Sequence, residues 1–82
     1  MSTRIARLGQ DPNAPFPFPK GTRVARINPD GTLDEEYRGE IIDGTCEYEE
    51  SGSGWRDVLY VVKRADGRVF RARDFSLSRI EP

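Results

Sequence analysis

The sequence contains no histidine, and Cys46 is its one cysteine. A lone cysteine excludes a disulfide within the chain, and without imidazole the zinc sites that combine thiolates with histidines are excluded as well. The longest apolar run, Val58 to Val62, is five residues long, whereas a membrane helix needs about 20. The first residues also lack the apolar core of a secretory signal. The sequence therefore predicts a cytoplasmic protein that binds neither a metal nor a membrane.

The net charge of the chain is small, but its charged residues are unevenly distributed. The net charge is −1, yet residues 1–27 carry +4, residues 28–51 carry −8 and residues 52–82 carry +3. A protein that coats nucleic acid without sequence preference needs a basic surplus, so this balance argues against that class. The segregation permits a basic face opposed to an acidic one, and a solvated acidic loop explains the middle segment equally well.

Proline is rare outside the N-terminal segment, because four of the six prolines lie within residues 1–19. Closely spaced prolines remove backbone donors and favour an extended path. We expect residues 1–19 to form a flexible tail, with Phe16 and Phe18 as its only large apolar anchors. Residues 20–82 then form one small domain, whose core is thin at this length.

The domain sequence predicts five short strands and no long helix. Runs rich in β-branched and aromatic residues, bounded by turn residues, indicate strands. Gly39 and Gly44 flank the β-branched pair Ile41 and Ile42, where a sharp bend or a close backbone neighbour is expected. The expected strands cover residues 23–27, 37 to 46 or 49, 57–64, 68–73 and 79–81.

Turn residues separate these strands. Asn28–Gly31 has the proline and the Asp-Gly pair of a tight turn, and Thr32–Glu36 is expected to continue it as an acidic loop. Its carboxylates do not have the spacing of a calcium-binding loop. Ala65–Gly67 predicts a hairpin turn, and Asp74 is expected to cap one helical turn over Phe75–Ser78.

This order of elements resembles the SH3-like small barrel over residues 20–82. The layout is more specifically similar to the plasmid-encoded type B dihydrofolate reductases. The Gly-x-Arg-Val start of that family resembles Gly21–Val24, its Trp-x-Gly-x-Ile resembles Tyr37–Ile41 and its closing Leu-x-Arg-Ile resembles Leu77–Ile80. The resemblance implies a five-stranded barrel that assembles as a tetramer around one pore and uses NADPH.

The pore segment departs from that family. Its Val-Gln-Ile-Tyr motif is replaced by Val69-Phe70-Arg71-Ala72, and its pore lysine falls at Arg26. Four copies of Arg71 around one pore would repel each other unless an anion lay between them. The sequence therefore predicts a shared scaffold more readily than a shared reaction, because function depends on the site.

The residues offer little for catalysis. Cys46 has no histidine to activate it and is expected to be an inert buried thiol. Glu47 and Glu49 would share one face of a strand, which fits a solvated surface better than an acid–base pair. The short Gly52–Gly54 segment has no helix after it and so does not predict a phosphate loop.

Binding is the better-supported class. Trp55 and Arg56, with Tyr48 and Tyr60 as candidates to join them, form an aromatic and cationic group of the kind enriched at protein contacts. Closure of one end of the core explains Trp55 slightly better than a ligand role does. On residues 68–73, alternation places Arg68, Phe70 and Ala72 on one side and Val69, Arg71 and Arg73 on the other. The candidate binding residues are Arg26, Tyr48, Trp55, Arg56, Phe70, Arg71 and Arg73.

Three functions are compatible with these features. The first is a non-catalytic small-barrel module that binds another protein or its own copies, such as an accessory protein of a phage, plasmid or bacterium. The second is a nucleic-acid-binding barrel that uses the basic residues of 63–73. The third is a diverged reductase, and NADPH is expected as a cofactor only in that case.

Overall fold

The computed structural model of the protein describes residues 3–10, 16–49 and 55–80, without the side chains of residues 3, 48, 49, 55 and 56. Within these residues six strands form one antiparallel sheet, and a single 3-10 turn is the only helical element, which confirms the all-β prediction. The elements are β1 (Thr3–Arg7), β2 (Arg23–Ile27), β3 (Leu33–Glu49), β4 (Trp55–Arg64), β5 (Val69–Arg73), η1 (Asp74–Ser76) and β6 (Leu77–Arg79).

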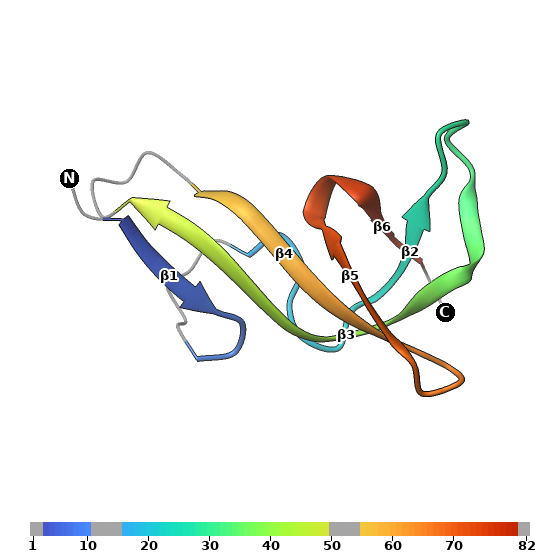
Figure 1. Cartoon of the computed structure of the whole chain (residues 1–82), viewed down its shortest axis with the longest axis horizontal. Coiled ribbons are helices and arrows are strands. Elements are labelled where there is room, and N and C mark those ends of the chain that lie inside the picture. Colours follow the sequence, from blue (N-terminus) through green and yellow to red (C-terminus); the bar gives the residue numbers. More distant parts are fainter. Residues whose placement is uncertain (1–2, 11–15, 50–54, 81–82) are drawn as a thin grey trace.

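The 17-residue strand β3 is the centre of the sheet (Figure 1). One of its edges pairs with β4 over most of its length, and the other edge pairs first with β2 and then with β1. Between β2 and β1, the N–H of Gly21 donates to the carbonyl of Ile41, and the N–H of Leu8 donates to the carbonyl of Gly44. Both edges of β3 are therefore occupied, as the backbone groups of a buried strand require.

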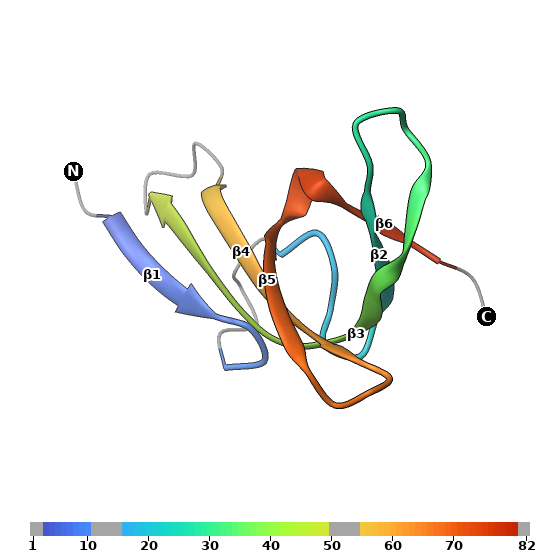
Figure 2. The ribbon, with the colours of Figure 1, turned by 45° about the vertical axis from the view of Figure 1, so that its right-hand side comes forward.

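The sheet is strongly curved. Its strand order is β5-β4-β3-β2-β6, and the two strands at the ends of that order are joined by the three residues of η1 (Figure 2). The pairing of β3 with β4 shifts register between Ile41 and Asp43 and again between Thr45 and Glu47. Such bulges bend a strand, so they account for the curvature.

Two glycines of β3 lie against β4, as the sequence predicts. A Cβ atom at Gly39 would overlap the backbone carbonyl of Lys63, and one at Gly44 would lie 3.0 Å from the Tyr60 ring. Only glycine fits the first position without a backbone shift. The prediction of a close backbone neighbour at these glycines is confirmed.

The core lies on the inner side of the curved sheet and is built around Tyr60, which is fully buried. Its other members are small or aliphatic, so the core is thin, as expected for a chain of this length. Leu8, Phe16, Phe18 and Phe70 pack against it while partly exposed. The buried residues of this core cluster are Ala6, Val24, Ile41, Cys46, Val58, Tyr60, Val62, Ala72 and Leu77.

The segment expected to be a separate tail contributes to the sheet and to the core. Residues 3–7 form β1, a sixth strand that the sequence analysis missed. The Phe18 N–H donates to the Tyr60 hydroxyl at 2.8 Å, and that hydroxyl donates to the Phe18 carbonyl at 3.2 Å. Tyr60 is thus a core residue rather than a neighbour of a Trp55 surface, because these bonds satisfy its buried hydroxyl.

The remaining differences concern element ends. β3 begins at Leu33, so most of the expected acidic loop is strand. η1 begins at Asp74 itself, with Arg73 as the capping residue and no side-chain cap. The last strand is Leu77–Arg79 rather than 79–81, because its pairing with β2 begins at Leu77. Glu81 lies outside the described residues.

Candidate functional site

The alternation of β5 divides its residues between the core and the outer face of the sheet. Phe70 and Ala72 point inward, whereas Val69, Arg71 and Arg73 are exposed. Phe70 meets the ring of Tyr37 edge-on, with the ring centroids 5.4 Å apart. Phe70 is therefore mainly a packing residue, and the exposed surface of β5 consists of Val69, Arg71 and Arg73.

A small group of apolar side chains lies on the outer face. Leu59 and Val61 of β4 are half-buried there, and Val69 of β5 is 57% exposed. Arg71 pairs with Val61 across the two strands, which places the guanidinium beside these aliphatic groups. We name Leu59, Val61, Val69 and Arg71 the apolar strip.

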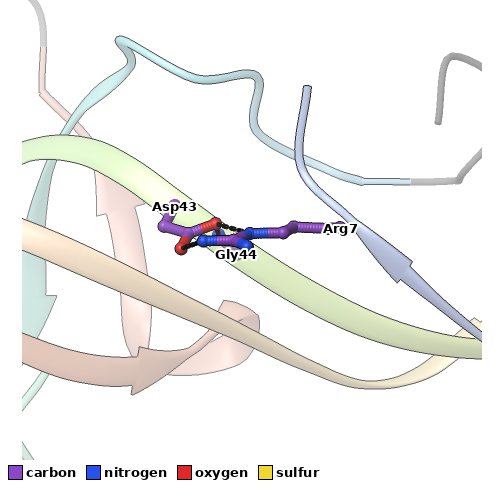
Figure 3. Close-up of polar contacts among 3 residues, drawn as sticks. All are labelled: Arg7, Asp43 and Gly44. Carbon is purple, nitrogen blue, oxygen red and sulfur yellow. Dashed lines mark hydrogen bonds and ion pairs between the residues drawn. The ribbon is translucent and has the colours of Figure 1, made fainter. Parts of the chain in front are cut away.

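The apolar strip continues into a hollow of about 350 Å³ towards β1 and β3, which reaches Arg7 and Asp43. Figure 3 shows the Arg7 side chain directed at Asp43, with Nε 3.2 Å from Oδ1 and Nη2 2.8 Å from Oδ2. The Arg7 bonds and the Gly44 N–H lower the pKa of Asp43. This two-bond pair fixes one wall of the hollow.

The two exposed cations of β5, Arg71 and Arg73, differ in their partners. Arg73 lies 3.2 Å from Asp57, and both side chains are at least half exposed, so water screens the pair. Asp57 has a φ of 54° in an irregular part of β4, which is uncommon for a residue other than glycine. Among the described residues Arg71 has no ion-pair partner.

A second surface feature is an open cleft of about 440 Å³ where β2, β3 and β4 lie side by side. Its lining contains four cations, which lie around Gly39, and one carboxylate, that of Glu40. Ala65 and Ile80 complete the lining. We name the four cations, Arg23, Arg38, Lys63 and Arg64, together with Glu40, the basic cleft.

Arg26, which the sequence analysis placed at the position of a pore lysine, lies over the ring of Tyr37. Its Cζ atom is 4.5 Å from the ring centroid, and the Cζ of Arg64 is 5.3 Å from the same centroid. Both distances are in the range of cation–π attraction. Tyr37 thus links Arg26 to the basic cleft through Arg64.

The hairpin between β2 and β3 carries the opposite charge. It lies at the other end of the molecule from β1 (Figure 1), and Asp30, Glu35 and Glu36 are exposed on it. The hydroxyl and N–H of Thr32 lower the pKa of Asp30, and the N–H groups of Tyr37 and Glu36 lower that of Asp34. Asp30 and Asp34 therefore keep their negative charges well below neutral pH.

The candidate group around Trp55 lies at the far end of the β3–β4 pairing. Tyr48 and Trp55 are backbone partners there, and Arg56 pairs with Glu47. The side chains of Tyr48, Trp55 and Arg56 lie outside the described part of the structure. Their role in binding stays a prediction.

The described residues contain no group of three or more side chains of the kinds that hold a metal ion. Cys46, the one cysteine, is buried in the core. No helix within residues 3–10, 16–49 and 55–80 has the length and apolarity to cross a membrane.

Comparison of the chain with protein-family models, with curated proteins and with solved structures finds no match.

Proposed function

We propose that the chain is a non-catalytic binding module on an SH3-like small barrel, and that it acts through contacts with protein, including further copies of itself. The apolar strip is the observation that carries this proposal. It combines partly exposed aliphatic side chains on a sheet face with an arginine that lacks an ion-pair partner among the described residues. Apolar residues and arginine are enriched at the centres of protein interfaces, whereas lysine and the acids are depleted.

The free energy gained when the apolar strip is removed from water favours its contact with a protein surface. Each Å² of apolar surface removed from water contributes about 25 cal/mol, and Val69 leaves more than half of its surface in water. Val61 and Arg71 face the same way across paired strands. A flat partner can therefore cover the strip without a change in the sheet.

The resemblance to the type B reductases supports contact between copies, because that family assembles from SH3-like chains. The segment that replaces the family's pore motif divides between two faces, since Phe70 and Ala72 point into this chain's own core and Val69 and Arg71 point outward. This arrangement favours a shared scaffold over the NADPH-dependent reaction.

The test is the solution mass, measured by light scattering on a sizing column over a concentration series. The unaltered chain is expected to exceed the mass of one chain as concentration rises, and Val69→Lys is expected to restore the single-chain mass. Phe75→Lys is the matched control, because Phe75 is also highly exposed, at 74%, but lies on η1 outside the strip.

A single-chain mass at every concentration would contradict self-association. An equal effect of the two lysine variants would contradict the apolar strip as the contact surface. Circular dichroism of both variants checks that the sheet is retained.

A further inference from the structure

The basic cleft has no role in the contact proposed above, and its chemistry differs from that of the apolar strip. Its lining holds four cations against one carboxylate and only two apolar residues, Ala65 and Ile80. Lysine and glutamate are depleted at the centres of protein interfaces, where arginine is accompanied by aromatic and other apolar residues. We propose that the basic cleft binds the phosphate backbone of a single-stranded nucleic acid.

The pairing of the strands brings two of the cations, Arg23 and Lys63, to one face. Arg23 of β2 is opposite Glu40 of β3, and Glu40 is opposite Lys63 of β4. Adjacent strands are about 4.8 Å apart, so the backbones of the first and third of these residues lie about 10 Å apart. Within the described residues Arg23 and Lys63 form no ion pair, which leaves both free for phosphate oxygens.

The other two cations are held in place by contacts that leave donors unused. Nε of Arg38 donates to the backbone carbonyl of Asp34 at 3.2 Å, and its terminal nitrogens form no hydrogen bond or ion pair with the described residues. Arg64 lies over the ring of Tyr37 and 3.3 Å from a carboxylate oxygen of Asp66, which is itself partly exposed. A guanidinium has five N–H donors, so each of these arginines keeps donors for a ligand in a geometry that is already set.

The surroundings favour a single strand over a duplex. The cleft is open and about 440 Å³ in volume, which accommodates a few sugar–phosphate units. The acidic hairpin begins beside it, because Asp34 contacts Arg38 and Glu36 follows two residues later. A duplex carries one charge per 1.7 Å of its axis and would bring its second strand towards these carboxylates, whereas a single strand can follow the cleft.

The expected behaviour is weak binding with a strong dependence on salt. Contacts with three to four phosphates of a single strand give a slope of log K against log salt of about −2 to −3. The affinity should then fall about 20- to 50-fold between 50 and 200 mM salt. The measurement is fluorescence anisotropy of a labelled 12-nucleotide thymidine strand with the full-length chain.

The decisive variant is the double substitution Arg23→Ala, Lys63→Ala. It is expected to lower the affinity about tenfold or more and to reduce the magnitude of the salt slope by about 1.4, that is, by two phosphate contacts. Arg79→Ala is the control, because Arg79 is also exposed but is paired opposite Val24 and lies outside the lining of the cleft. Its affinity should stay within about twofold of the unaltered chain.

Several results would overturn the proposal. They are binding without salt dependence, equal losses in the control and the double variant, tighter binding of the matching duplex, and displacement of the strand by pyrophosphate at equal phosphate concentration. Self-association that is abolished by the cleft variant, with no binding of the strand, would assign the cleft to the acidic hairpin of a second copy instead. Val69→Lys should leave strand binding in place, which separates this test from that of the apolar strip.

Discussion

The two faces of β4 differ sharply in how far their side chains are exposed. Its inward residues Val58, Tyr60 and Val62 are at most 1% exposed. The residues that alternate with them, Leu59, Val61 and Lys63, lie on the outer face and are half-buried or exposed. Stability and surface chemistry are thus carried by alternate residues of one strand, so a substitution can change one and leave the other.

The largest effect is expected at Tyr60. Tyr60→Ala removes the largest fully buried side chain of the core and should lower the free energy of unfolding by about 3–5 kcal/mol. Such a loss is close to the whole stability of a small domain. Val61→Ala, one residue along the strand, should cost less than about 1.5 kcal/mol because Val61 is only half-buried. Urea unfolding followed by circular dichroism gives both values, and similar losses would contradict the contrast between the faces.

A smaller loss is expected where the backbones of β3 and β4 touch. In Gly39→Ala the new Cβ meets the carbonyl of Lys63, so the strands must separate, at a cost of about 1–3 kcal/mol. The neighbouring exposed variant Arg38→Ala should change stability by less than about 0.5 kcal/mol. Thermal unfolding of the two variants makes the comparison, and a stable Gly39→Ala protein would show that the contact is dispensable.

The smallest effect tests one atom of the inward face. Tyr60→Phe keeps the ring but leaves the N–H and carbonyl of Phe18 without the hydroxyl, and should cost about 1–2 kcal/mol near neutral pH. Burial raises the pKa of Tyr60 to about 12, from a usual value of 10.0. The folded state therefore holds this proton at a pH where the unfolded chain releases it.

The pH dependence of that variant follows from the sign of the shift. The contribution of the Tyr60 hydroxyl is complete below pH 10 and is lost as the pH rises from 10 to about 12. The stability difference between Tyr60→Phe and the unaltered chain should thus shrink over this range. Urea unfolding at several alkaline pH values measures it, and a difference that stays constant would contradict a raised pKa.

The sequence predicts the parts of the fold that rest on local pattern. The strand at 23–27, the hairpin turn at 65–67 and the two glycines of β3 are found as expected. β1 was missed because its pattern is inverted: Ile5, its largest apolar residue, is 75% exposed, and the small Ala6 is the residue that is buried. Only its pairing with β3 gives this segment a structure.

The candidate sites, too, could be predicted only where local pattern determines them. Alternation within β5 predicts that Arg71 and Arg73 share a face, and only the packing of Phe70 decides which face is outward. The cations of the basic cleft come from three strands that are far apart in the sequence. Their juxtaposition depends on register, and no spacing along the chain indicates it.

The hydrogen bonds between Phe18 and Tyr60 join residues 42 positions apart. In a series of N-terminal deletions, stability should thus fall abruptly once the deletion reaches Phe16 and Phe18. A chain that begins at Lys20 would uncover the Tyr60 ring, which Phe16 and Phe18 contact at centroid distances of 6.1 and 5.8 Å. Anyone who shortens or fuses this protein for expression should keep residues 16–19, because they close the core.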